Sequence, residues 1–218
     1  MATRTSPALR QYGAALRTLL VLTVILGLAY PLAMTALAQV AFGDNANGSL
    51  VTRSGRTVGS DLIGQAFTRP VMENGQPRKD ADGNPVVEAD PAYFQSRPSA
   101  AGAGYDPLSS SASNLGAENK DLIAAIKDRR AIAARLDGVD PQQVAPDALL
   151  ASGSGLDPHI SPAYANQQVA RVARERGLDV AKVRALVTVY TQGRTLGFLG
   201  EPRVNVLKLN MALDAVGR

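Results

Sequence analysis

A run of 26 residues, from Thr18 to Gly43, contains no charged side chain. An α-helix of that length would extend for about 39 Å, which exceeds the ~30 Å hydrocarbon thickness of a bilayer. A single segment can cross a membrane only as a helix, because lipid offers the backbone no hydrogen-bond partners. Pro31 should kink this helix or mark a weak turn in it. The run therefore predicts one transmembrane helix near the N-terminus.

The charges on either side of this span predict its orientation. Arg4, Arg10 and Arg17 precede the span, and Asp44, the first acidic residue of the chain, follows it. A positively charged flank stays in the cytoplasm. We therefore expect a single-pass protein of the cell (inner) membrane, with a cytoplasmic tail over residues 1–17, a transmembrane helix over 18–43 and an extracytoplasmic domain over 44–218.

A cleaved secretory signal peptide is the alternative to a retained anchor. Ala36-Leu37-Ala38 fits a small-x-small cleavage site, and cleavage there would leave a secreted binding protein that begins near Gln39. The apolar segment before Ala36 is longer than the usual 7–15 residues of a signal peptide. The retained anchor is therefore the favoured interpretation.

The formal charge of +4 does not indicate a nucleic-acid partner. Of the 23 basic residues, three precede the span, which leaves 20 against 19 acidic residues in the remainder. A nucleic-acid-binding protein would carry its basic excess on the folded domain. The chain also lacks cysteine, which excludes disulfides, thiolate metal sites and cysteine nucleophiles.

Short β-prone runs open the outer part of the chain. Residues 49–65 predict a hairpin that turns at Ser54-Gly55. Residues 73–90 are rich in Gly, Pro, Asn and charge, and predict an exposed loop with a turn at Asp82-Gly83.

Helical signals dominate the second half. A helix is expected to begin near Asn119 and to end at Gly138, with an apolar face that contains Leu122, Ile123, Ile126 and Ile132. Three further helices are expected to begin at Ser161-Pro162, at Asp179 and at Asn205. The fold class is therefore α+β: one N-terminal transmembrane helix followed by a single extracytoplasmic α+β domain.

The stretch SGSGLDPHISP, residues 152–162, raises the question of catalysis, because Ser154, Asp157 and the only histidine, His159, lie together in it. The spacing of its glycines does not match the Gly-x-Ser-x-Gly elbow of α/β-hydrolases. Turn and helix-cap chemistry explains each residue separately, so no catalytic residue is assigned. A membrane-anchored extracytoplasmic hydrolase that uses these three residues remains an alternative. One histidine without cysteine also predicts no transition-metal site.

Several blocks together resemble a known family. SGSGLDPHISPAYANQQVARVARERGL and GRTLGFLGEPRVNVLKLNMALD, preceded by GSDLIGQAF, YFQSRPSA and YDPLSSSASNLG, resemble KdpC, the C-subunit family of the bacterial Kdp potassium-transporting P-type ATPase. The resemblance covers nearly the whole chain in order. It implies a non-catalytic, single-span accessory subunit that is needed for assembly and activity, and that lies in membrane lipid with the Kdp A, B and F subunits. Segment 73–90 looks like an insertion relative to shorter members.

The resemblance also implies a link to ATP. The family is described as a catalytic chaperone that raises the ATP affinity of the B subunit, and its serine-rich loop is a suggested nucleotide contact. Here that loop would place Ser111, Ser113 and Asn114 on the nucleotide. The predicted orientation puts the loop outside the membrane and ATP inside. We therefore expect no cofactor, with ATP as the one candidate that the family implies.

Overall fold

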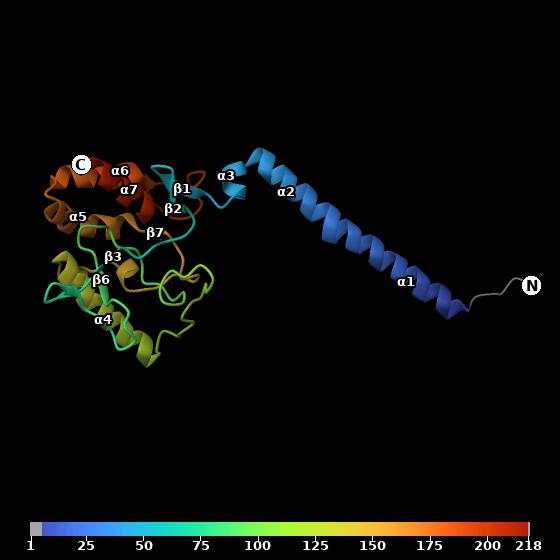
Figure 1. Cartoon of the computed structure of the whole chain (residues 1–218), viewed down its shortest axis with the longest axis horizontal. Coiled ribbons are helices and arrows are strands. Elements are labelled where there is room, and N and C mark those ends of the chain that lie inside the picture. Colours follow the sequence, from blue (N-terminus) through green and yellow to red (C-terminus); the bar gives the residue numbers. More distant parts are fainter. Residues whose placement is uncertain (1–5, 218) are drawn as a thin grey trace, which may run out of the picture. The chain divides into compact units, whose positions relative to one another are not determined.

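A computed structural model describes residues 6–217, which form two units, one that ends at Leu50 and one that begins at Val51 (Figure 1). The first unit consists almost entirely of helix. The second mixes helices with short strands, as the α+β prediction requires. Arg4, one of the three arginines that predict the orientation, lies outside the described residues.

The first unit contains a continuous helical segment of 35 residues, from Pro7 to Ala41, that is long and apolar enough to cross a membrane. It begins well before Thr18 because Ser6 caps it, with Oγ accepting a hydrogen bond from the Leu9 amide at 3.3 Å. Its three parts are α1 (Pro7–Val24), a π-helical turn η1 (Ile25–Ala29) and α2 (Tyr30–Ala41).

The irregularity expected around Pro31 takes the form of the π-helical turn that precedes it. Proline has no amide hydrogen, and its ring would collide with the carbonyl four residues earlier, at Gly27. In η1 the backbone is wound more widely, and the Tyr30 amide bonds to the Ile25 carbonyl. The wider turn relieves the collision without ending the helix.

A short helix, α3 (Gly43–Ala46), follows the first unit's long helix. The predicted hairpin is confirmed, with β1 (Leu50–Arg53) paired to β2 (Arg56–Ser60). Its turn lies at Ser54 and Gly55, which both have positive φ angles (50° and 77°), as a tight hairpin turn requires.

Segment 73–90 is largely exposed, as expected, but its description as a loop is incomplete. β3 (Thr68–Pro70) pairs with β6 (Val87–Ala89), and β4 (Met72–Glu73) pairs with β5 (Gln76–Pro77) through a turn at Asn74-Gly75. Asn-Gly is the strongest short hairpin signal, so this hairpin was predictable from the sequence, in place of the loop expected there. The predicted turn at Asp82-Gly83 is present, with the Gly83 amide bonded to the Asp80 carbonyl.

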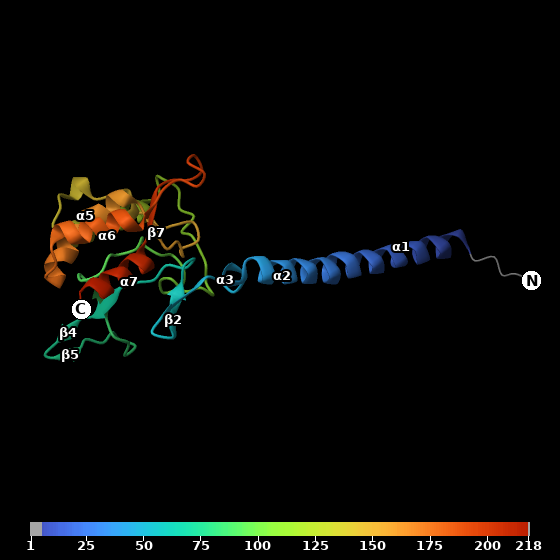
Figure 2. The same ribbon diagram turned by 90° about the horizontal axis from the view of Figure 1, so that it is seen from above.

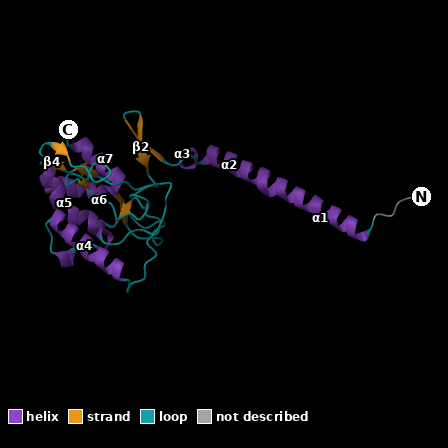
Figure 3. Cartoon of the chain, turned by 60° about the horizontal axis from the view of Figure 1, so that its bottom comes forward, coloured by secondary structure: helices purple, strands orange, loops and turns teal. Residues whose placement is uncertain are grey.

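The four predicted helices are confirmed. Their bounds are α4 (Lys120–Asp137), α5 (Pro162–Arg176), α6 (Val180–Tyr190) and α7 (Val206–Val216). Each begins after the expected cap, whose side-chain oxygen accepts backbone amide hydrogen bonds: Asn119, Ser161, Asp179 and Asn205. Two short 3₁₀ turns, η2 (Pro141–Gln143) and η3 (Pro146–Ala148), follow α4. Figure 3 shows α4 to α7 gathered on one side of the second unit and mostly loops on the other.

A small antiparallel sheet lies beside the helices. β9 (Arg203–Asn205) is its central strand, with β7 (His159–Ile160) on one edge and β8 (Thr191–Gln192) on the other. The core is built between this sheet and the inner faces of the helices, and its fully buried members include Phe94, Ile160, Val169, Val172, Val183, Val187, Val204, Leu209 and Leu213.

The apolar face predicted for α4 is wrong in part. Ile123 and Ile132 are exposed, whereas Ala133, Ala134 and Asp137 are buried. Asp137 reaches a buried partner on α5, and the face of the helix that turns inward carries two alanines, whereas Ile126 packs against the core only partly buried.

Candidate functional site

Asp157 and His159 form a joined pair at the start of β7. Oδ1 of Asp157 accepts a hydrogen bond from the His159 amide at 2.9 Å and lies 3.1 Å from His159 Nδ1. Nη1 of Arg97 lies 3.6 Å from the other carboxylate oxygen. Burial opposes ionisation of this carboxyl, but the hydrogen bonds from His159 and the charge of Arg97 outweigh it, so the pKa of Asp157 lies below its ordinary value.

Ser154 is not placed to act with this pair. Its Oγ accepts a hydrogen bond from the Leu156 amide at 3.1 Å and lies 3.5 Å from Ser152 Oγ. Within residues 6–217, no hydrogen bond joins Ser154 to His159. A serine nucleophile must be in hydrogen-bond reach of its base, so the arrangement does not assemble the three residues as a triad.

A charged cleft of about 490 Å³ lies against the Asp157–His159 pair. Asp147 and Ser161 also line the cleft, and both hold the start of α5 in place. Asp147 accepts a hydrogen bond from the Ser161 amide, and Ser161 Oγ accepts one from the Tyr164 amide at 3.1 Å. The polar groups that line this part of the cleft therefore serve the local structure, and the predicted cap at Ser161 is confirmed.

The serine-rich loop packs against the segment that contains Ser154. The Ser154 carbonyl accepts a hydrogen bond from the Ser111 amide and another from the Ser110 hydroxyl, both at 3.0 Å. The serine-rich loop and the segment that contains Ser154 are therefore one structural element, although they lie far apart in the sequence. Ser113 and Asn114 are exposed, and Asn114 has a φ angle of 50° and bonds through Nδ2 to the Ala112 carbonyl at 3.3 Å.

Gly155 is the point of closest approach between these two segments. Its φ angle is 68°, and a Cβ atom added there would lie 2.7 Å from both the Ala101 amide nitrogen and the Ser111 carbonyl oxygen. Only glycine fits this position without displacing the serine-rich loop.

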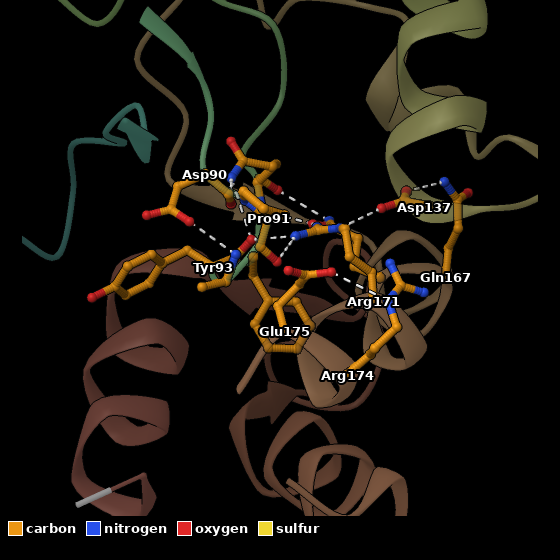
Figure 4. Close-up of polar contacts among 12 residues, drawn as sticks. Asp90, Pro91, Tyr93, Asp137, Gln167, Arg171, Arg174 and Glu175 are labelled. Atoms are coloured by element: carbon orange, nitrogen blue, oxygen red, sulfur yellow. Dashed lines mark hydrogen bonds and ion pairs between the residues drawn. The ribbon is translucent and has the colours of Figure 1, made fainter. Parts of the chain in front are cut away.

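A buried polar cluster surrounds Arg171 (Figure 4), and no local sequence pattern predicts it. Arg171 and Gln168 lie one turn apart on the inner face of α5, and both side chains are fully buried. The Arg171 guanidinium donates to Asp137, to Gln168 and to the carbonyls of Pro91 and Tyr93. The cluster fixes α4 and the 91–93 segment to α5, and among the described residues no buried side-chain nitrogen or oxygen lacks a hydrogen-bond partner.

A second cavity, of about 290 Å³, is lined mainly by apolar side chains, among them Phe67, Leu207 and Met211. Asp214 lies at its edge and pairs with Arg53 and with Arg176. Although partial burial opposes ionisation, the hydrogen bonds from the two arginines hold the pKa of Asp214 below its ordinary value. In the part of the chain that the structure describes, no group of three or more acidic or histidine side chains is placed to hold a metal ion.

Comparison with known proteins gives one consistent result. Residues 12–215 match the family model described as "KdpC: K+-transporting ATPase, c chain". The potassium-transporting ATPase KdpC subunit of Kineococcus radiotolerans is 52% identical over 205 residues, which are 94% of this chain and 93% of the relative. The KdpC subunits of Koribacter versatilis and Rhodospirillum rubrum are 48% and 49% identical, with 88–89% of each chain covered. The match spans both structural units, and the chain therefore belongs to the KdpC family, the c chain of potassium-transporting ATPases.

Proposed function

We propose that this chain is the accessory subunit of a high-affinity, ATP-driven potassium uptake pump, in which it acts by contact and carries out no chemistry of its own. The observation that supports this most strongly is the extent of the family match, which covers the apolar helix and the mixed unit alike. The site geometry supports it as well, because Ser154 Oγ bonds to Ser152 and Leu156 and, in the described part of the chain, has no hydrogen bond to His159.

We further propose that the apolar helix anchors the chain with its N-terminus in the cytoplasm. Arg10 and Arg17 lie in α1, and Asp44, in α3, is the first acid after the span. The chain has no cysteine, so single cysteines can be introduced and probed in intact cells. A membrane-impermeant thiol reagent should label Ser113→Cys in intact cells and Ala8→Cys only after lysis. The reverse pattern would contradict the proposed orientation.

With this orientation, any effect of the chain on ATP affinity must be indirect. Ser111, Ser113 and Asn114 would lie on the side of the membrane opposite to cytoplasmic ATP. Raising the ATP affinity of the ATP-hydrolysing subunit would then require a conformational coupling through subunit contacts. Replacement of all three residues by alanine should leave the ATP concentration for half-maximal pump activity within about twofold. A shift of more than about 150-fold, beyond the range of typical allosteric coupling, would favour direct contact.

The functional test uses a strain that lacks its own KdpC-type subunit and grows poorly at low external potassium. We expect the intact chain to restore growth, because the anchor raises the local concentration of the outer unit at its membrane partners. The anchor alone and the outer unit alone should both fail. Rescue by the outer unit without its anchor would instead favour the secreted binding protein.

A membrane-anchored hydrolase is the second candidate, and the contact between Asp157 and His159 is the observation that favours it. Its nucleophile would have to be a hydroxyl other than Ser154. Rescue of growth by a His159→Ala chain would exclude hydrolysis as the activity that supports growth.

A further inference from the structure

The loop between β8 and β9 exposes an apolar tip. Leu196 and Phe198 are 78% and 68% exposed, and Leu199 is half exposed. Figure 2 shows this orange-red segment protruding from the second unit beside β7. Large apolar side chains that gather on an exposed surface mark interaction sites, because water exposure of such a patch is unfavourable.

The tip is held in one conformation by its own hydrogen bonds. Thr195 and Leu199 exchange two backbone hydrogen bonds, both 2.9 Å, and the Gly197 amide bonds to the Arg194 carbonyl at 3.1 Å. Below the tip, Arg194 Nη2 bonds both carboxylate oxygens of Glu201, at 2.9 and 2.8 Å. A loop built in this way loses little conformational freedom when it binds.

Leu196 presents an apolar side chain from an unfavourable backbone conformation. Leu196 has a φ angle of 55°, a conformation that is unfavourable for leucine and easily adopted by glycine or asparagine. Either of those residues would relieve the strain, but neither would present an apolar group. Strained residues of this kind cluster where the strain serves binding or catalysis.

The charge of the loop favours a protein partner over lipid. Arg194 and Glu201 neutralise each other, and residues 193–202 carry no other charge. Segments that bind lipid surfaces usually carry an excess of Lys and Arg, and Trp and Tyr are the aromatic residues enriched at the interface. The tip has neither feature. A fixed loop with a central phenylalanine suits an apolar pocket, where buried aromatic anchors supply much of the binding energy.

A second copy of the chain is a less suitable partner for the apolar tip than a different protein. The 290 Å³ cavity at Leu207 and Met211 could receive a tip from another copy. Such a head-to-tail contact would propagate from copy to copy unless it closed into a ring. We propose that residues 195–200 insert into an apolar pocket on the extracytoplasmic side of another subunit of the pump, an inference that rests on the proposed function.

The first test compares two matched variants of the full chain, each co-expressed with the other pump subunits. Leu196→Asn/Phe198→Ser removes the apolar tip and relieves the backbone strain. Val189→Ser changes a residue of α6 that is 76% exposed and lies outside the loop. With equal amounts of chain in the membrane, the tip variant should recover at least about tenfold less of the other subunits, as expected for loss of an anchor residue. The Val189→Ser chain should recover as much as the unaltered chain.

Equal recovery by the tip variant would overturn the inference. If the unaltered chain itself recovered no pump subunit, the proposed function would fail instead, so the two failures can be told apart.

The second test identifies the occupant directly. p-Benzoylphenylalanine in place of Phe198 should crosslink, on illumination of intact membranes, to an extracytoplasmic segment of another pump subunit, located by peptide mass spectrometry. Crosslinking to lipid alone, crosslinking to a second copy, or no crosslink in complexes that still assemble would each overturn the inference.

Discussion

Arg171 of α5 and Asp137 at the end of α4 form an ion pair inside the protein. Nε of Arg171 lies 2.8 Å from Oδ1 of Asp137, and the side chains are 0% and 2% exposed. Loss of one partner leaves the other charge buried without compensation, which costs about 3–5 kcal/mol. Asp137→Ala should therefore lower the free energy of unfolding by that amount, measured by urea denaturation of the detergent-solubilised chain.

The exposed pair between Arg69 and Glu88 provides the matched control. Both side chains are about half exposed, and surface pairs contribute about 0–1 kcal/mol. Glu88→Gln should change the unfolding free energy little. Equal effects of Asp137→Ala and Glu88→Gln would show that the buried pair does not hold α4 to α5.

Stability should depend on pH through Asp214. Its pKa in the folded chain lies below its ordinary value, because Arg53 and Arg176 stabilise the charged form against the opposing effect of burial. Its contribution is therefore complete above the unfolded pKa of about 3.9, and is lost as pH falls through the folded pKa. Asp214→Asn should lower the urea midpoint at pH 7, and its difference from the unaltered chain should shrink below about pH 4.

Glu118→Gln is the control for this pH series. Glu118 is exposed and forms no ion pair with the residues that the structure describes. It should leave the urea midpoint unchanged at both pH values. A constant difference between Asp214→Asn and the unaltered chain across the acid range would contradict the assignment of the pH dependence to Asp214.

Substitution by alanine should affect stability very differently at two glycines of one turn. Gly155 has a positive φ angle and abuts Ala101 and Ser111, whereas a Cβ atom at Gly153 would meet open space. Gly155→Ala should destabilise the chain by about 1–3 kcal/mol and speed amide hydrogen exchange in the serine-rich loop. Gly153→Ala should do neither. If both variants exchanged at the rate of the unaltered chain, the two segments would not depend on each other for their order.

The helices of the second unit could be predicted because their signals are local. Asn119, Ser161, Asp179 and Asn205 all cap the helices that the sequence assigned to them, since a cap depends on a few neighbouring residues. The tight turn at Ser54-Gly55 was predictable for the same reason.

Contacts between distant residues were not predictable from such signals. The pairing of Arg171 with Asp137, and the packing of Ser111 against Ser154, join segments 34 and 43 residues apart. The face of α4 was misassigned because Asp137, a charged residue, points inward. Hydrophobic periodicity assigns charged residues to the surface, so it cannot reveal a charge that is neutralised inside the fold.

Neither Ser154 nor His159 should be needed for turnover of the assembled pump. Ser154→Ala removes the hydroxyl that the sequence alone suggested as a nucleophile, and His159→Ala removes the imidazole that a hydrolase at this position would still need. Each variant should leave potassium-dependent ATP hydrolysis within about threefold of the unaltered complex. General acid–base groups contribute about 10²–10⁴-fold. A loss of more than roughly a hundredfold in a fully assembled complex would restore the catalytic interpretation.

This chain is expected to work only as a bound subunit of a potassium pump. The most direct measurement is affinity purification of the tagged, full-length chain from membranes that express the other pump subunits, with each recovered protein identified and quantified. We predict recovery of the potassium-binding and ATP-hydrolysing subunits in a fixed ratio to the chain, together with potassium-stimulated ATP hydrolysis. A chain that purifies alone from the same membranes, while the other subunits assemble and hydrolyse ATP without it, would contradict the claim.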